Sequence, residues 1–188
     1  MNRTYQITEW CHHFIKEHVK EGDICIDATA GNGNDTEYLC RLTGPSGKVY
    51  AFDIQSQALE HTKARLENAG FSATLILDGH ENMEQYVSEK GQVSCAVFNF
   101  GYLPGGDHAL STQAPTSIRA LEAALNLLKK DGILSLCIYS GGDSGFEEKE
   151  ALLAFLRTLD KKRFLCIVSE YYNRPNHPPI PVLVVKLA

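Results

Sequence analysis

Two apolar runs, each ending in a carboxylate, flank a small-residue turn and hold the residues best suited to chemistry. The stretch 23–36, DICIDATAGNGNDT, places Asp27 at the end of the first run and Gly31 and Gly33 in the turn. Glycine is needed where a backbone bends sharply or lets a ligand approach closely. The second run ends in Asp53, whose carboxylate could accept hydrogen bonds from both hydroxyls of a ribose. Open α/β sheets bind nucleotide-like ligands at such turns, so this pattern predicts a nucleoside site.

Helical and strand patterns alternate along the chain and position these residues. Helices are expected at about 4–20, 34–43, 55–69, 81–89, 115–130 (ended by Gly132) and 146–159. Strands are expected at 23–28, 48–53, 73–77, 93–99, 133–139, 164–172 and 181–187. Strands separated by helices imply a mostly parallel sheet with helices on both faces.

The end of the chain identifies the type of sheet. No helix fits between residues 172 and 181, so the last two strands are expected to pair as an antiparallel hairpin. This order predicts an α/β fold, the Rossmann-like seven-stranded sheet of class I S-adenosylmethionine-dependent methyltransferases. A dinucleotide dehydrogenase sheet, by contrast, stays parallel at that edge. We expect a single domain, 1–188, that begins with a helix at about 4–20.

Composition narrows the class of protein. The chain has 188 residues, 44% of them hydrophobic, and its apolar runs are too short to span a bilayer. The amino terminus lacks the pattern of a secretory signal, so a cytoplasmic location is expected. The six cysteines form no CxxC pair, which favours buried thiols over disulfides or a metal site, and we predict no metal.

The net charge of −5 means that a polynucleotide partner would need a local basic patch. The candidate patches are Lys129-Lys130, Lys161-Lys162-Arg163, and Arg3, Lys16 and Lys20 with His12 and His13.

The glycine turn fits two ligand classes imperfectly. As a dinucleotide fingerprint it has Thr36 in place of the third glycine. As a methyltransferase turn it has Thr29 in place of the first glycine, and the predicted hairpin favours this interpretation. Asp27 would then orient the turn or receive the ligand's amino group, and the backbone from Ala28 to Asn34, including Gly31 and Gly33, would hold the methionine moiety. The side chains of Asn32 and Asn34 can donate and accept hydrogen bonds, and Gln55 stands beside Asp53 as a further cofactor contact.

The third and fourth strands end in further polar residues. His80 or Glu81, after the third strand, could reach the adenine or the ribose. The fourth strand ends in Asn99, which begins a loop that would face the methyl group and is related to the Asn/Asp-Pro-Pro-Tyr/Phe pattern of amine-methylating enzymes. Asn99 can accept a hydrogen bond from an amine, Tyr102 can stack or hydrogen-bond, and Asp107 could take the proton that the nucleophile loses.

The loop 171–179, between the hairpin strands, is expected near the same rim. Its Tyr172, Arg174 and His177 could stack with a base or contact phosphate. Turn formation explains the prolines and asparagines of this loop equally well.

Three segments resemble the family of small bacterial rRNA methylases: 27–36 (DATAGNGNDT), 51–55 (AFDIQ) and 99–107 (NFGYLPGGD). They are similar to the tRNA 5-aminomethyl-2-thiouridine methyltransferases of Gram-positive bacteria, and the similarity covers essentially the whole chain. Asn34 departs from the pattern, because histidine is expected there in some relatives.

The resemblance implies N-methylation of the aminomethyl group on the wobble uridine of tRNA, with S-adenosylmethionine as cofactor and a homodimer as the assembly. The cofactor residues that it implies are Asp27, Asn32, Asn34, Asp53, Gln55, His80 and Glu81. The acceptor residues that it implies are Asn99, Tyr102 and Asp107, and Asn99 would also contact the cofactor. An rRNA or small-molecule methyltransferase, a non-catalytic nucleotide-binding module and a dehydrogenase remain as alternatives.

Overall fold

The computed structural model describes residues 6–101, 112–139, 142–174 and 178–188, with the side chains of 142–145 left aside. Its helices are α1 (Ile7–His18), α2 (Asn34–Thr43), α3 (Ser56–Ala69), the 3₁₀ helix η1 (His80–Gln85), α4 (Ala114–Leu127) and α5 (Gly142–Arg157). Its strands are β1 (Ile24–Asp27), β2 (Lys48–Asp53), β3 (Thr74–Leu77), β4 (Val93–Phe100), β5 (Leu128–Ile138), β6 (Phe164–Val168) and β7 (Ile180–Lys186).

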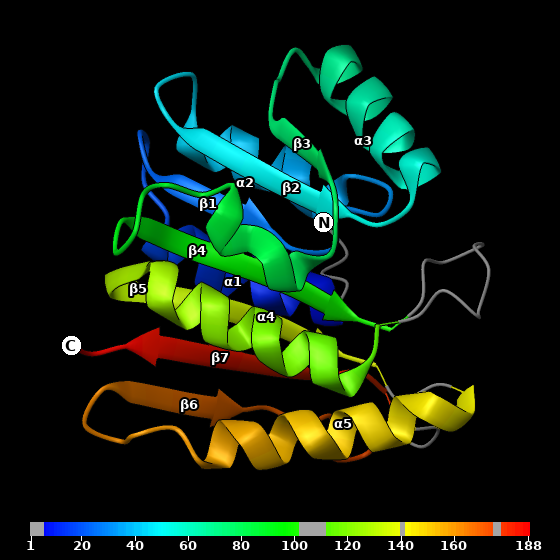
Figure 1. Ribbon diagram of the computed structural model, residues 1–188, viewed down its shortest axis with the longest axis vertical. Helices are drawn as coiled ribbons and strands as arrows, with labels where there is room; N and C mark the ends of the chain where they lie inside the picture. Colours follow the sequence, from blue (N-terminus) through cyan, green and yellow to red (C-terminus); the bar gives the residue numbers. More distant parts are fainter. Residues whose placement is uncertain (1–5, 102–111, 140–141, 175–177) are drawn as a thin grey trace.

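All seven strands form one sheet in the order β3-β2-β1-β4-β5-β7-β6. The pairs from β3 to β5 are parallel, whereas β7 runs antiparallel to both β5 and β6, which confirms the predicted hairpin. The strands β1 to β4 therefore end at one edge of the sheet, where their arrowheads point in Figure 1. The chain reverses strand order between β1 and β4, and open α/β sheets bind ligands at such a switch point.

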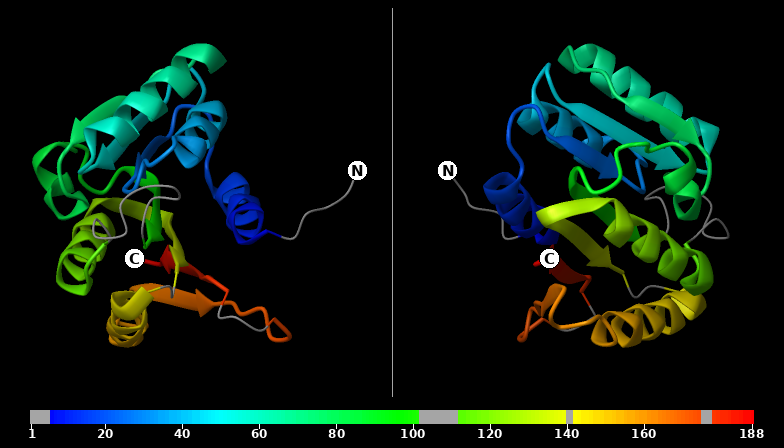
Figure 2. Two further views of the ribbon diagram at one scale, coloured as in Figure 1. Left: turned by 90° about the vertical axis from the view of Figure 1, so that its right-hand side faces the viewer. Right: turned by 60° about the vertical axis from the view of Figure 1, so that its left-hand side comes forward.

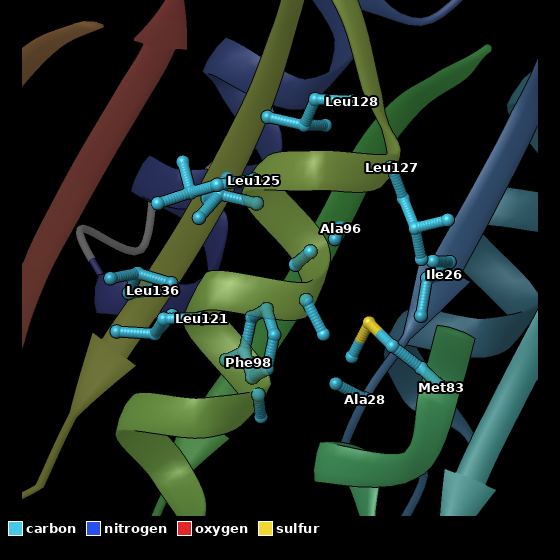
Figure 3. Close-up of a cluster of buried hydrophobic side chains, with 14 of the residues drawn as sticks. Ile26, Ala28, Met83, Ala96, Phe98, Leu121, Leu125, Leu127, Leu128 and Leu136 are labelled. Atoms are coloured by element: carbon cyan, nitrogen blue, oxygen red, sulfur yellow. The ribbon is translucent and has the colours of Figure 1, made fainter. Parts of the chain in front are cut away.

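Helices cover both faces of the sheet. Figure 2 shows α1 and α2 on one side and α4 with η1 on the other. The side of α4 and η1 holds the larger core, in which side chains from β1, β4 and β5 meet Leu121, Leu125 and Met83 (Figure 3). Aliphatic side chains at three- and four-residue spacing give α4 its apolar face, and their burial supplies most of the stabilisation here.

A second, smaller core lies under α1 and α2. It contains Ile15 of α1 and Leu39 of α2, packed against Cys25, Cys95 and Val97 of the two central strands. The central strands are thus apolar on both faces, as a parallel sheet between two helical layers requires. All six cysteines are free thiols, five of them buried and Cys166 half-buried.

The structure corrects several predicted boundaries. The fourth long helix ends at Leu127 instead of about 130, and Gly132 lies inside β5 instead of ending the helix. Leu125 and Leu128 are both buried, so the three-residue apolar spacing fits a helix end followed by a strand start as well as it fits a longer helix. Asp131 has φ 62°, and a Cβ on Gly132 would lie 2.9 Å from the Val93 carbonyl oxygen, so the chain bulges tightly there.

Other boundaries differ by smaller amounts. The predicted strand 164–172 ends at Val168. The Ser169 amide still donates a hydrogen bond to the Pro181 carbonyl, and beyond it the chain no longer pairs with β7. The predicted helix 81–89 is the shorter η1, and the predicted helix 146–159 begins at Gly142 and ends at Arg157. Gly70 ends α3 as predicted, with φ 74°. Within the described residues no helix is both long and apolar enough to cross a membrane.

Candidate active site

The glycine turn after β1 is braced from below by α3. Gly31 and Gly33 have φ of 52° and 76°, in the left-handed region that favours glycine. A Cβ on Gly33 would lie 2.9 Å from the Thr62 Cα, so α3 can pack this closely only against glycine. Thr62 Oγ1 donates to the Gly31 carbonyl at 3.2 Å and Arg65 Nε donates to the Asn32 carbonyl at 2.8 Å. The turn is therefore held through its carbonyl oxygens.

Asp27 is buried beneath this turn. Its carboxylate accepts the Thr36 hydroxyl at 2.6 Å and the Thr29 amide at 3.1 Å. Both contacts are made within the turn and the start of α2, and the two roles predicted for Asp27 stay predictions. Burial and the negative charges of Asp35 and Asp53 together raise the pKa of Asp27 to about 7.

Asp53 ends β2 beside the turn and is half-buried. One carboxylate oxygen accepts the Gly31 amide and the other accepts the Gln55 amide, both at 2.9 Å. An ionised carboxylate has about four acceptor positions, so each oxygen can accept another hydrogen bond. The geometry thus leaves Asp53 able to bind two hydroxyls. Ile54 follows it with 58% of its surface exposed, an apolar contact beside the acid that the sequence analysis missed.

The two predicted residues after β3 differ in exposure: His80 is buried and Glu81 is half-exposed. His80 is buried against Phe98 and Phe100, and its Nδ1 lies 3.2 Å from the Ala28 carbonyl oxygen. Burial lowers the pKa of His80, which favours the neutral ring. His80 therefore packs under the turn, and Glu81 is the residue of this pair nearer to solvent.

Asn99, near the end of β4, lies next to the turn. Its backbone amide donates to Thr29 Oγ1 at 2.8 Å, and its side-chain Nδ2 donates to Asp35 Oδ2 at 2.7 Å. Asp35 is in the first turn of α2 and also contacts His12 of α1, with 2.5 Å between Nε2 and Oδ1. Asp35 was not predicted as a site residue, and His12 was named only in a candidate basic patch. The neighbouring end of β5 carries Tyr139, whose Cβ would be 3.2 Å from a Cβ on Gly101.

The chain on either side of the Asn99 loop is pinned at its base. The Gly101 amide donates to Thr112 Oγ1 at 2.8 Å, and the Thr112 amide donates to the Gly101 carbonyl at 3.1 Å. Thr112 Oγ1 donates in turn to the buried Glu148 at 2.8 Å. Tyr102 and Asp107, predicted to serve the acceptor, lie outside the described residues.

The remaining predicted residues are more exposed. Asn34 is exposed at the first residue of α2, Asn32 and Gln55 are half-buried, and Ala28 is buried at the end of β1. Tyr172 is 97% exposed and Arg174, in the same turn, is also exposed, whereas His177 lies outside the described residues.

The basic patches differ in how available their charges are. Lys129 Nζ donates to Asp23 at 2.7 Å, while Lys16 and Lys20 are exposed on and just after α1, and Arg3 lies outside the described residues. Among the described residues, no three His, Cys, Asp or Glu side chains are arranged to hold a metal ion.

A pocket of about 210 Å³ lies between α1 and the ends of β4 and β5. Residues from four elements line it, including His12 of α1, Asp35 of α2, Asn99 of β4 and Cys137 of β5. Cys11 and Cys137 interact there through their thiols, and that contact lowers the pKa of Cys11. A sequence signal existed for Asp35, because a residue just inside the helix after the turn must lie at the carboxyl edge of the sheet. The position of His12 depends on where α1 docks, which no local pattern indicates.

This chain is similar to several known proteins. A family model described as "Putative rRNA methylase" matches residues 49–185. A chloroplastic tRNA (mnm(5)s(2)U34)-methyltransferase of Arabidopsis thaliana is 38% identical over 181 residues, which is 91% of this chain and 66% of that protein. This chain therefore spans slightly less than two thirds of the length of that relative.

Two solved structures are similar over nearly their whole length. One, from Clostridium thermocellum and described in the same words as the family, has a TM-score of 0.95 and 45% identity, with 98% of this chain and 99% of that chain covered. The other, a Streptococcus mutans protein described as a methyltransferase and solved with S-adenosylhomocysteine, has a TM-score of 0.89 and 38% identity, with the same coverage.

Proposed function

Because the chain belongs to the rRNA methylase family, we propose that it transfers the methyl group of S-adenosylmethionine to RNA. The acceptor that we propose is the aminomethyl nitrogen of 5-aminomethyl-2-thiouridine, at the wobble position in the anticodon of tRNA. The name of the Arabidopsis relative supports this choice of acceptor, since it specifies the nucleoside mnm(5)s(2)U at position 34 of tRNA.

The acidic character of the glycine turn carries the proposal. Asp27 and Asp53 lie at the turn, close enough for the negative charge of Asp53 to add to the burial that raises the pKa of Asp27. Arg65, the cation at the turn, is engaged by the Asn32 carbonyl and by Glu37. Such a turn favours a ligand with positive charge, as S-adenosylmethionine has on its sulfonium and amino groups, over the pyrophosphate of a dinucleotide. The residues present therefore fit the cofactor.

Individual residues then have distinct roles toward the cofactor. Asp53 would accept the two ribose hydroxyls, because each of its oxygens has an unused acceptor position. Exposed Ile54 would provide an apolar contact for the adenine, and Glu81 could accept from its amino group. Asp27 and Thr29 keep the turn in shape, and Thr29 also fixes the backbone of Asn99. Gln55 and Asn32 lie at the margins of the same site.

The chain's contribution to the reaction is to position the amine. The cofactor supplies a methyl group on sulfur; the N–C bond forms as the S–C bond breaks, and the S–C electron pair stays on sulfur. Asn99 Oδ1 would accept one N–H of the neutral amine and so aim its lone pair at the methyl carbon. The amine must first give up its ammonium proton, for which we propose Asp107, and the product ammonium later releases a proton to water. We propose that Tyr102 stacks on the acceptor base.

The RNA would approach over the carboxyl edge of the sheet. Tyr172 is almost fully exposed and can stack on an unpaired base, and Arg174 in the same turn can contact phosphate. We assign the same role to His177. The substrate is a folded RNA of translation, so the cytoplasm is the compartment in which we propose that the protein works.

A homodimer is the assembly that we propose. The edge strand β6 exposes Leu165, Ile167 and Val168, and a groove of about 290 Å³ runs from it to Trp10 and Phe14 of α1. Leu165 and Ile167 lie on the same face of β6 and, with Trp10 and Phe14, form an apolar face at the free edge of the sheet. A second copy of the chain would cover this face, because exposed apolar patches of this kind commonly mark interfaces.

The test uses purified protein, labelled S-adenosylmethionine and two tRNA samples of the same sequence. One sample carries 5-aminomethyl-2-thiouridine and the other carries 2-thiouridine without the aminomethyl group. We expect label only in the first, recovered by mass analysis as the methylaminomethyl nucleoside. Ribosomal RNA is a third substrate: label there, with none in either tRNA, would replace the wobble uridine by an rRNA site. Absence of label in all three would contradict the proposal.

A further inference from the structure

We propose that Asp35 and His12 are positioning residues that set the orientation of the Asn99 amide for catalysis. This inference rests on the proposed function, because it concerns how Asn99 presents itself to an amine. Asp35 lies between the two other residues, with one carboxylate oxygen bound to each. The three residues come from α1, α2 and β4, which only the folded chain brings together.

The two ends of the Asn99 side-chain amide differ in what they can bind. An ionised carboxylate can only accept hydrogen bonds, so the group that Asn99 directs at Asp35 must be its NH₂. The observed Nδ2 to Oδ2 distance of 2.7 Å is that of a charge-assisted hydrogen bond. The amide oxygen is consequently the end left for a substrate. In the opposite orientation, the Asn99 amide would present its NH₂ group to the N–H of the substrate amine. It could then not accept a hydrogen bond from the amine, and the amine lone pair would not be oriented.

The backbone of Asn99 is held by contacts of its own. Its amide donates to Thr29 Oγ1 at 2.8 Å, and its Cα pairs with Cys137 of β5 in the sheet. The main chain is therefore fixed independently of Asp35. What Asp35 determines is the side-chain rotamer and the choice between the two amide orientations. A group fixed in this way loses little entropy when it binds the acceptor.

Asp35 itself is supported by His12 of α1. His12 Nε2 contacts Asp35 Oδ1 at 2.5 Å, and the His12 ring stacks on Tyr38 with centroids 3.8 Å apart and planes 4° apart. The Tyr38 hydroxyl donates to the His12 carbonyl at 3.0 Å. One residue of α1 is thus held three times by α2, which fixes α1 over the end of β4. The amino-terminal helix α1 thereby supports the acceptor site, although the site itself is built from the ends of strands and the glycine turn.

Asp35 could instead serve the cofactor, and the two roles predict opposite effects on binding. As a positioning residue, Asp35 can be removed without weakening the binding of S-adenosylhomocysteine. Its loss also removes a negative charge that raises the pKa of Asp27. A cofactor-binding role requires the affinity to fall when the carboxylate is removed.

The first experiment is a double-mutant cycle on Asp35→Ala and Asn99→Ala. We expect Asp35→Ala to lower kcat about 10- to 100-fold, the range for a misplaced reacting group. The KM for S-adenosylmethionine and the calorimetric Kd for S-adenosylhomocysteine should stay within about twofold. On the Asn99→Ala background, Asp35→Ala should cost about twofold or less, because the two residues act through one another. Additive losses, or a weakened Kd, would overturn the inference.

The second experiment asks whether geometry alone rescues activity. Asp35→Asn can accept from Asn99 and donate to His12, so we expect it to recover most of the kcat that Asp35→Ala loses. His12→Gln should lower kcat several-fold. His18→Gln is the matched control and should leave kcat unchanged, because the His18 ring contacts the Phe14 carbonyl of the same helix through its Nδ1. In nuclear magnetic resonance spectra, the Asn99 side-chain amide should exchange faster with solvent in Asp35→Ala than in the wild type. An unchanged exchange rate would contradict the inference.

The outcomes separate this inference from the function on which it rests. If the wild type methylates neither tRNA sample, the proposed function fails, and the amide exchange of Asn99 still reports whether Asp35 holds it. If the wild type methylates the aminomethyl tRNA and Asp35→Ala does so at the same rate, the function stands and the positioning role is wrong.

Discussion

The substitution Asp53→Asn tests the nucleoside site in a way that the geometry makes quantitative. Each oxygen of Asp53 accepts a backbone amide, from Gly31 on one side and from Gln55 on the other, both at 2.9 Å. Asparagine has the same shape but only one acceptor oxygen. Whichever way it turns, its NH₂ group meets a backbone N–H, so one of these two bonds is lost. The same end can no longer accept a ribose hydroxyl.

The size of the effect follows from the bonds lost. A hydrogen bond to a charged group contributes about 1.5–3 kcal/mol, and each 1.4 kcal/mol corresponds to about a tenfold change in affinity. Losing one such bond to the ribose should therefore weaken S-adenosylhomocysteine binding about 10- to 100-fold. The broken backbone bond loosens the turn, which adds to the loss. The turn keeps its brace from α3 through Thr62 and Arg65, so the variant should still fold.

Isothermal titration calorimetry with S-adenosylhomocysteine measures this affinity directly. Glu60→Gln is the control, because it removes an exposed carboxylate from α3 without touching the turn. Thermal unfolding of each variant without ligand separates loss of fold from loss of binding. The reasoning is refuted if Asp53→Asn lowers the unfolding temperature but binds the ligand as tightly as the wild type. Asp53 would then only hold the turn and the start of α3.

Three further predictions concern stability and assembly. The pKa of Asp27 is raised from 3.8 to about 7, so its neutral form stabilises the fold, and that stabilisation is lost as pH rises from about 4 through 7. This rise in pKa corresponds to at most about 4 kcal/mol of stability. In denaturant titrations, Asp27→Asn should therefore be more stable than the wild type at pH 8 but not at pH 4. The lowered pKa of His80 has the opposite effect on stability, but it is common to both proteins and cancels in the comparison. Gly33→Ala should lower the free energy of unfolding by about 1–3 kcal/mol, because a Cβ there would lie 2.9 Å from the Thr62 Cα. Gly70→Ala should cost less, because the space around its Cβ is open. Equal losses of stability in thermal unfolding would contradict this prediction. Ile167→Glu should convert the proposed dimer to a monomer in light scattering, and a wild type that is itself monomeric would remove the basis for this assembly.

The fold was predictable from the sequence because its signals are local. Apolar runs end in Asp27, Asp53 and Asn99, and helical patterns separate them, so the parallel order and the common edge followed. The absence of room for a helix between 172 and 181 gave the antiparallel hairpin, which the structure confirms. The family was also identified correctly from three short segments.

What the sequence could not supply depends on packing between distant elements. The end of α4 was misplaced because Leu128 fits the apolar face of a helix and the start of a buried strand equally well. The sequence left two roles open for Asp27 and could not show that its side chain is buried. The cofactor contact predicted for His80 stays a prediction, and the sequence could not show its burial, because the phenylalanine rings of β4 that pack against it are remote in sequence. His12 could be connected with Asn99 only once α1 was placed.

We propose that the site at the carboxyl edge of this sheet transfers a methyl group from S-adenosylmethionine to the aminomethyl nitrogen of the wobble uridine, and that Asn99 orients this amine. The most direct measurement is nucleoside mass analysis of tRNA from a strain lacking the gene, with and without a plasmid copy. The account predicts that 5-aminomethyl-2-thiouridine accumulates in the deletion strain, that the wild-type gene restores the methylated nucleoside, and that Asn99→Ala does not. Unchanged methylaminomethyl nucleoside in the deletion strain would contradict it.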